Sequence, residues 1–146
     1  MSRGTSALRL IGLCARTATG FHRRSARIAK RKGRYNRNGK FLVEQKSDGA
    51  AIGRVGANYY DVVTWERSAD GIPELGWALA REHWGHGYAS EAALAVRDWL
   101  QGPRVISLIA SGNTRSQGVA KRLGATPGET IELPGYGPHV IWEHPR

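Results

Sequence analysis

The order of apolar and polar positions predicts a run of strands between residues 40 and 80. Residues 40–45 and 50–60 are each predicted to form a strand, and the turn residues 46–49 between them are typical of a hairpin. Residues 61–73 contain several turn-forming types and are predicted to form a loop. A third strand is predicted at 74–80, and its larger apolar side chains share one face: Leu75, Trp77 and Leu79.

A helix and a buried strand follow. Residues 90–100 place apolar side chains at helical spacing, which predicts an amphipathic helix with this buried stripe: Ala92, Ala93, Val96, Trp99 and Leu100. Residues 104–110 are almost all apolar apart from Arg104 and Ser107, as expected for a strand that is covered on both faces.

The last part of the sequence predicts a second helix and a final hairpin. Asn113 is a residue type that caps helices, Val119 and Leu123 lie on the side expected to be buried, and Gly124 fits the position just past the end. Residues 130–133 and 139–142 flank a Pro/Gly-rich stretch and are predicted to pair as strands.

The charge divides the chain into two parts. The whole sequence has a net charge of +10, yet residues 1–43 hold 12 Lys/Arg and no acidic residue, whereas the remainder holds 10 Lys/Arg and 12 Asp/Glu. We therefore predict a basic N-terminal segment at 1–39 and one globular domain at 40–146, which is the size expected of a single domain. The apolar run at 7–15 is interrupted by Arg9 and is too short to span a membrane.

Several interpretations of the basic segment stay open. Residues 21–32 have a thin apolar stripe, so they could form a solvated helix or a patch that contacts RNA or the ribosome through residues 1–40. An organelle-targeting segment, or sequence foreign to the domain, would have the same composition.

Cysteine and histidine usage restricts the chemistry. A single cysteine, Cys14, excludes an intramolecular disulfide and fits a reducing compartment, so we expect a cytoplasmic protein. The five histidines are scattered without the spacing of zinc ligands, so no metal site is expected.

The most informative stretch lies between the third predicted strand and the first predicted helix. It reads Trp84-Gly85-His86-Gly87-Tyr88-Ala89, with Ser90 and Glu91 following. Glycines at a helix N-terminus let unpaired backbone amides approach an anion, most often a phosphate. A Gly-x-Gly alone is more often a plain turn than an anion site, and neither the dinucleotide nor the Walker spacing is completed here.

The flanking residues resemble the Gcn5-related N-acetyltransferase (GNAT) family. The pyrophosphate loop of that family reads Gln/Arg-x-x-Gly-x-Gly/Ala, which this chain matches at Gly87 and Ala89, with Trp84 in place of Gln or Arg. A second block, residues 113–125, is similar to the Asn-x-x-Ser-x-x-Val-Ala-x-x-Leu-Gly segment of the branch that acetylates ribosomal-protein N-termini at alanine or serine. The resemblance extends from about Phe41 to Trp142, with none that is convincing before Lys40.

The resemblance implies an α/β fold and a cofactor. The fold would be a single GNAT-like domain, with a mixed, mostly antiparallel sheet whose central strands splay apart and are flanked by helices. Acetyl-CoA would lie in the splay as cosubstrate. The residues implied to bind it are Trp77, Ala78, Leu79, Gly85, His86, Gly87, Tyr88, Ala89, Ser90 and Asn113.

The implied reaction is direct attack of a primary amine on the thioester. It requires a base for the amine and an acid for the leaving thiolate. Many members use a tyrosine as the acid, but Ala120 stands at that position, so Ser116 is the candidate by comparison with the ribosomal branch. Ser116 could equally be a polar residue that satisfies the first helical turn. Glu74 and Glu132 are the candidate bases, and Glu74 is explained more simply as an ordinary carboxylate at a strand edge. Tyr136 could line an acceptor pocket or form a hairpin tip.

The acceptor half departs from the family pattern. Members normally have a strand and two helices before the position of Phe41, and the link between Leu100 and Val105 is short for the family. The acceptor walls could come from a second copy of the chain in a homodimer. The main prediction is an N-acetyltransferase that acts on a protein N-terminus or a small amine. The alternative is a catalytically impaired protein that binds acyl-CoA, or RNA through its basic arm.

Overall fold

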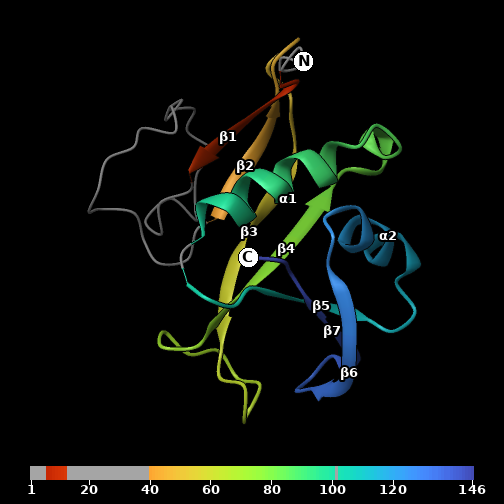
Figure 1. Ribbon diagram of the computed structural model, residues 1–146. Coiled ribbons are helices and arrows are strands. Elements are labelled where there is room, and N and C mark those ends of the chain that lie inside the picture. The colour runs from red at the N-terminus through yellow and green to blue at the C-terminus, as the bar shows by residue number, and fades with distance from the viewer. Residues whose placement is uncertain (1–5, 13–39, 101) are drawn as a thin grey trace.

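The computed structural model describes residues 6–12, 40–100 and 102–146, which form seven strands, two α-helices and one short 3₁₀ helix (Figure 1). In chain order the elements are β1 (Leu8–Gly12), β2 (Lys40–Gln45), β3 (Ala51–Tyr60), β4 (Ile72–Leu79), η1 (Arg81–His83), α1 (Tyr88–Trp99), β5 (Ile106–Ala110), α2 (Thr114–Arg122), β6 (Thr126–Leu133) and β7 (Gly137–Glu143).

The strands form one sheet in the order β1-β2-β3-β4-β5-β7-β6. Every neighbouring pair is antiparallel except β4 and β5, which are parallel and are in register only at Glu74 and Ile106. Beyond that single pair the two strands diverge (Figure 1). The mixed, mostly antiparallel sheet with splayed central strands is therefore confirmed.

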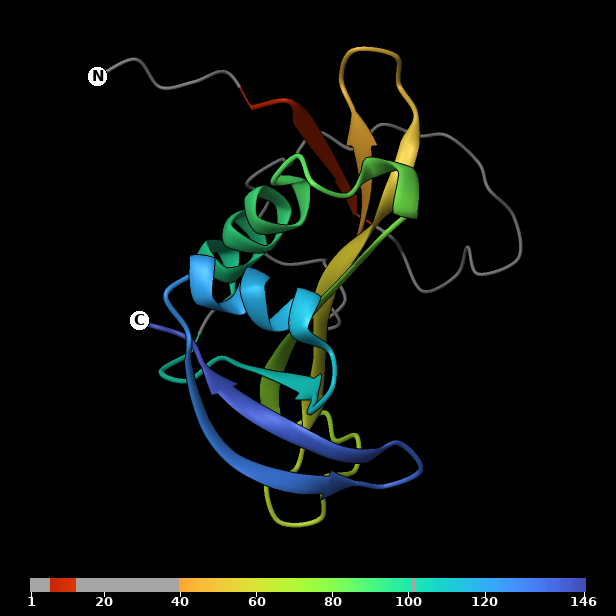
Figure 2. The ribbon, with the colours of Figure 1, turned by 90° about the vertical axis from the view of Figure 1, so that its right-hand side faces the viewer.

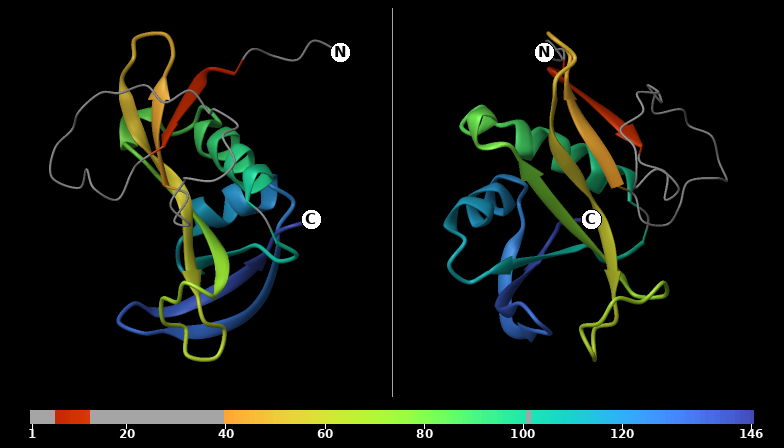
Figure 3. Two further views of the ribbon diagram at one scale, coloured as in Figure 1. Left: turned by 90° about the vertical axis from the view of Figure 1, so that its left-hand side faces the viewer. Right: turned by 180° about the vertical axis from the view of Figure 1, so that it is seen from behind.

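Both α-helices lie on the same side of the sheet (Figure 2). The main core cluster lies between α1 and the first four strands, where Val55, Ala57, Leu75, Ala93 and Val96 are at most 2% exposed. Seen from behind, β3 and β4 lie in front of α1 (Figure 3, right). Alternation along β4 directs its larger side chains toward α1. Leu75 and Trp77 pack into the core, and the residue between them faces the other way.

The local predictions are confirmed with small shifts at the element ends. The first helix begins at Tyr88 rather than Ser90, because Gly87 adopts the left-handed conformation just before it. Asn113 caps α2 by accepting a hydrogen bond from the amide of Ser116 at 3.1 Å, and Gly124 follows the helix with φ +80°. The final hairpin is longer than predicted, since β6 begins at Thr126.

The first strand was missed. Leu8 and Leu10 are buried and Arg9 between them is exposed, where it forms an ion pair with Glu44 of β2 at 2.8 Å. The period of two extends over too few residues to indicate a strand until the pairing with β2 is known. The expectation that no family-like strand precedes Phe41 is therefore wrong. Cys14 and the predicted helix at 21–32 lie outside the described residues.

Two features are absent from the described residues. None of their helices is long and apolar enough to cross a membrane. No group of three or more of their His, Cys, Asp and Glu side chains could hold a metal ion.

Candidate active site

A cleft of about 760 Å³ opens between the end of β4, the start of α1 and the helix α2. Ten of the twelve residues predicted from the sequence line it: Trp77, Ala78, Leu79, Gly85, Gly87, Tyr88, Ala89, Ser90, Asn113 and Ser116. The two that do not are His86, which is exposed and stacks on Tyr88, and Glu74. Further lining residues that sequence reasoning did not single out as binding residues are His83, Trp84, Thr114, Arg115, Gly118, Val119 and Arg122.

The glycine turn leaves the N-terminus of α1 open toward this cleft. Gly85 and Gly87 have φ of +83° and +76°, and a Cβ built on either would meet no atom within 4 Å. Gly87 caps the helix without any side-chain hydrogen bond, so the first amides of α1 are left for a ligand. The guanidinium of Arg122 lies nearby, where it donates to the Ser90 hydroxyl at 3.0 Å. Amides, helix dipole and guanidinium together favour an anion.

Beyond Glu74, the edge of β4 that faces β5 contributes backbone groups that no described strand pairs with. Directly after β4, Ala80 donates its N–H to the carbonyl of Ile52 on β3 at 2.8 Å. Since backbone groups alternate in direction along a strand, the amide and carbonyl of Trp77 and the amide of Leu79 face β5, which has diverged at this point. An extended ligand with amide groups could therefore pair with β4 as an additional strand would.

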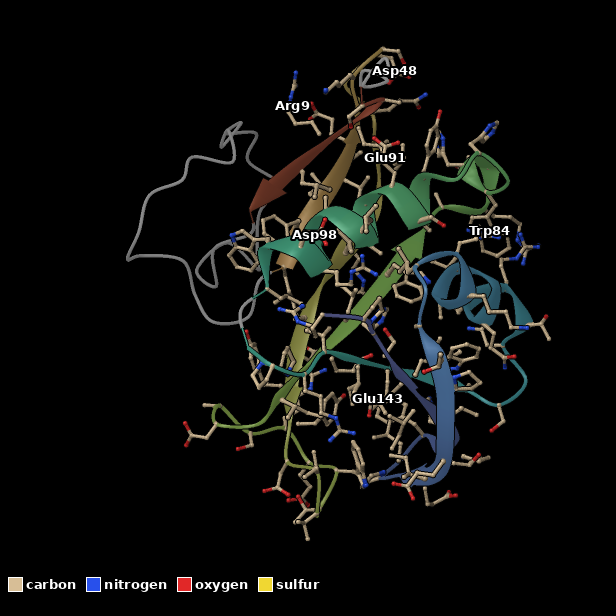
Figure 4. The ribbon with its side chains drawn as sticks, in the orientation of Figure 1. Arg9, Asp48, Trp84, Glu91, Asp98 and Glu143 are labelled. Carbon is tan, nitrogen blue, oxygen red and sulfur yellow. The ribbon has the colours of Figure 1, made fainter. Side chains whose placement is uncertain are left out.

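Trp84 connects this edge to α2. Its indole N–H donates to the carbonyl of Leu79 at 2.9 Å, and the guanidinium carbon of Arg115 lies 4.1 Å from the centre of its ring. Arg81 lies farther from the same ring, at 5.5 Å. Figure 4 shows Trp84 in the segment just before α1, on the side where α2 lies. No local pattern indicates these contacts, because they join residues on separate elements.

Glu74 lies at the narrow end of the splay. Its side chain accepts a hydrogen bond from the backbone N–H of Leu108 at 3.2 Å, so it bridges β4 to β5 just beyond their last paired position. A Cβ built on Gly76 would lie 3.9 Å from both carboxylate oxygens, which places the carboxylate over that glycine. Burial raises the pKa of Glu74 to about 7, opposed by hydrogen bonds from Leu108 and Asn58.

A second polar contact joins the same two strands. The hydroxyl of Ser107 donates to the carbonyl of Leu75 at 2.6 Å, so its oxygen must accept from Nε2–H of His144, which lies 2.8 Å away. The Nδ1 of the same ring is buried with no hydrogen-bond partner among the described residues, which favours a neutral imidazole with its proton on Nε2. Burial, with Arg97 nearby, lowers the pKa of His144 to about 4. Ser107 and His144 were not predicted, since nothing local marks them.

Ser116 lies in the first turn of α2 and lines the cleft. Its amide is bound by Asn113, and no hydrogen bond of its hydroxyl is seen in the described part of the chain. The role of satisfying backbone groups in this turn therefore belongs to Asn113. Ala120, at the position of the family tyrosine, is completely buried and faces the core rather than the cleft.

The other two acceptor-side candidates are solvent-exposed. Glu132 lies on β6 opposite Pro138, and Tyr136 is 76% exposed in the turn between β6 and β7. The interpretation of Tyr136 as part of a hairpin tip is confirmed, and neither residue lines the cleft.

Comparison with known proteins agrees with this geometry. The sequence profile of the acetyltransferase (GNAT) domain matches residues 9–126. The match therefore begins in β1, earlier than the predicted start near Phe41. An uncharacterized protein, YkkB of Bacillus subtilis, is 34% identical over 95 residues, which cover 62% of this chain and 52% of that protein. A solved GnaT-family acetyltransferase from Bordetella pertussis, itself described as putative, is 30% identical with a TM-score of 0.59, covering 74% of this chain and 65% of that one.

Two more distant structures share the fold alone. The ribosomal-protein-S5-alanine acetyltransferase of Vibrio fischeri is 21% identical with a TM-score of 0.55, covering 71% of this chain and 59% of that one. The aminoglycoside acetyltransferase AAC(6')-Ib, solved with coenzyme A and kanamycin, is 18% identical with a TM-score of 0.61, covering 73% and 66%.

The chain thus spans about half the length of the curated relative and about two-thirds of the Bordetella protein. The profile nevertheless covers most of this chain, from the first strand of the sheet to the first residue of β6. The chain belongs to the GNAT family of acetyltransferases.

Proposed function

We propose that this protein transfers an acetyl group from acetyl-CoA directly to a primary amine. The observation that carries the proposal is the cleft, in which an open helix N-terminus and an unpaired strand edge face the same space. The two features suit the two ends of acetyl-CoA. A pyrophosphate would bind the amides that follow Gly87, and the pantetheine arm would pair with Trp77 and Leu79 along β4.

The thioester would then lie where β4 and β5 diverge. On the cleft side, the hydroxyl of Ser116 would donate a proton to the departing thiolate. At the narrow end, Glu74 would accept a proton from the attacking amine, directly or through water. With a pKa of about 7 its carboxylate is partly ionised at neutral pH, which suits a general base.

The shared fold does not determine which amine is the acceptor substrate. Structures of similar TM-score are described as acting on a ribosomal protein and as binding an aminoglycoside, and both are below 25% identity to this chain. A protein N-terminus and a small amine are therefore both compatible with the shared fold.

Calorimetric titration of acetyl-CoA and CoA into the purified chain tests the cofactor site. We expect saturable binding that is lost in Gly87→Glu, because a carboxylate there would occupy and repel the phosphate position. Gly135→Glu is the matched control: Gly135 has φ +80° and open space around its Cβ, but it lies in the turn between β6 and β7. No binding by the folded wild-type chain, or equal loss in both variants, would refute the proposal.

A further inference from the structure

The ladder between β4 and β5 ends where a backbone donor and a backbone acceptor still face each other. Directly after β4, Ala80 donates its N–H to β3, and backbone groups alternate in direction, so the carbonyl of Leu75 faces β5. Just before β5, the carbonyl of Val105 accepts a hydrogen bond from the N–H of His144 at 3.0 Å, on the side of β7. The same alternation turns the N–H of Leu108 toward β4.

This donor and this acceptor would form the next bond of a regular ladder. The two strands are parallel and in register at Glu74 and Ile106, and that register makes the N–H of Leu108 the partner of the Leu75 carbonyl. Leu75 and Ser107, which would be the next pair, are not in register. The ladder therefore stops one bond short of what both strands present, and the strands diverge from this point (Figure 1).

Side chains bind both of these backbone groups instead. The hydroxyl of Ser107 donates to the Leu75 carbonyl at 2.6 Å, and the Glu74 carboxylate accepts from the N–H of Leu108 at 3.2 Å. Each side chain belongs to one strand and binds the backbone of the other. Leu75 is fully buried, and a buried carbonyl that loses its donor requires another. The donor that the register offers is the N–H of Leu108.

His144 sets the direction of the Ser107 hydroxyl proton. Its Nε2 lies 2.8 Å from the hydroxyl oxygen, and a hydroxyl has one proton, so donation from Nε2–H leaves that proton for Leu75. The backbone N–H of His144 is bound to Val105, so the ring is attached directly beside β5. Ser107 and His144 are only 1% and 6% exposed, so solvent has little access to either contact.

We infer that Ser107, oriented by His144, determines which acyl group the cleft accepts, because its hydroxyl keeps the ladder from closing at the acyl end. The inference rests on the proposed binding of acetyl-CoA, in which the pantetheine arm runs along β4 toward the point of divergence. Each residue by which the ladder advanced would remove about 3.3 Å of the space there, close to the length of an acetyl group. A further ladder bond would take up the N–H of Trp77, which lines the cleft.

Two matched pairs of proteins isolate the hydroxyl of Ser107. Ser107→Ala is compared with the wild type, and Ser107→Val with Ser107→Thr, which has nearly the same shape and keeps the hydroxyl. Calorimetry gives the dissociation constants of CoA, acetyl-CoA and butyryl-CoA, which differ only in the acyl group. In Ser107→Ala and Ser107→Val we expect acetyl-CoA to weaken about fivefold or more relative to CoA, the scale of one lost hydrogen-bonded contact, and butyryl-CoA to weaken further. Ser107→Thr should keep the wild-type ratio of the acetyl-CoA and CoA constants.

Two further variants separate this effect from a general loss of stability. Val43→Ala removes buried methyl groups from β2, away from the splay, and should leave the ratio of the acetyl-CoA and CoA constants as in the wild type. His144→Leu removes the donor to Ser107. It should change the ratio in the same direction as Ser107→Ala but by less, because the hydroxyl is still present.

NMR of the chain without ligand observes the ladder itself. A coupling across the hydrogen bond between the Leu108 amide nitrogen and the Leu75 carbonyl carbon should be absent in the wild type and in Ser107→Thr. It should appear in Ser107→Ala and Ser107→Val, because the Leu75 carbonyl then takes the N–H of Leu108 from the Glu74 carboxylate.

Different failures separate the two proposals. If CoA and acetyl-CoA bind and the ratio of their constants is unchanged or falls in Ser107→Ala and Ser107→Val, the inference is overturned while the proposed function stands. If neither ligand binds the folded wild-type chain, the proposed function fails, and the coupling still tests whether Ser107 holds the ladder open. Absence of the coupling from both Ser107→Ala and Ser107→Val would overturn the inference.

Discussion

The indole N–H of Trp84 donates to the backbone carbonyl of Leu79 at 2.9 Å, across the mouth of the cleft. This carbonyl belongs to the edge of β4 that faces the diverged β5, where a ligand could otherwise bind it. Trp84 therefore closes one end of the open strand edge. Through Arg115 over its ring, it also fixes the segment before α1 against α2.

Replacement of Trp84 tests this role. Trp84→Phe keeps a ring for Arg115 but removes the donor to Leu79, whose carbonyl loses a bond worth about 1 kcal/mol. We expect acetyl-CoA to bind several-fold more weakly by calorimetry while the melting temperature changes little, because Trp84 is partly exposed. Trp99→Phe, at a tryptophan of similar exposure on α1, is the control. Tighter binding in Trp84→Phe would mean that the ligand itself requires the Leu79 carbonyl.

The buried carboxyl of Glu74 predicts how stability depends on pH. Its pKa is raised from 4.5 to about 7 in the folded chain, so the neutral form is favoured there. The stabilisation of the fold by the neutral carboxyl is fully present below pH 4.5 and is lost as the pH rises through 7. Glu74→Gln should therefore be less sensitive than the wild type to a rise from pH 6 to pH 9 in urea unfolding. Parallel stability curves for the two proteins over that interval would contradict the assignment.

The same group predicts a pH–rate profile. If Glu74 accepts the amine proton, kcat/KM should rise with pH with a midpoint near 7. In Glu74→Gln that step should disappear and the rate should fall by about 10²-fold or more. Acetyl-CoA affinity should be kept, since Glu74 does not line the cleft. A Glu74→Gln enzyme with wild-type kcat and the same profile would exclude Glu74 as the base.

Protonation of His144 should weaken the fold. Its pKa is lowered from 6.5 to about 4 in the folded chain, so the contribution of the neutral ring is present above pH 6.5 and is lost as the pH falls toward 4. The melting temperature should therefore fall between pH 7 and pH 4. In His144→Gln the share of this fall that comes from protonation of His144 should disappear. His86→Gln, at an exposed ring that stacks on Tyr88, should leave the pH dependence unchanged.

Ser116 can be tested apart from binding. Ser116→Ala should lower kcat by about 10²-fold if its hydroxyl protonates the thiolate, because general acids contribute on that order. The dissociation constant for acetyl-CoA should stay the same, and Ser47→Ala, in the exposed turn between β2 and β3, should have no effect. Equal kcat values for Ser116→Ala and the wild type would mean that another group protonates the thiolate.

The sequence by itself determined the elements whose signals are local. Strand-like runs on either side of a hairpin turn predicted β2 and β3, alternation predicted β4, and the helical spacing predicted α1 and α2. Residue chemistry predicted the Asn113 cap and the glycine turn before α1, because capping and left-handed backbone depend on neighbouring residues. These signals, with the family resemblance, also placed ten of the twelve candidate residues around one cleft.

The tertiary structure decided what depends on distant pairing. β1 is short and became recognisable only beside β2, which follows 28 residues later. The contacts of Trp84 with Leu79 and Arg115 each join separate elements, as does the bridge from Glu74 to Leu108. Register set the face of the sheet that Lys40, Arg54 and Glu74 share, and a shift of one residue would have moved such side chains to the opposite face. Charge, burial and pKa at these positions follow from that register, so no local pattern could have revealed them.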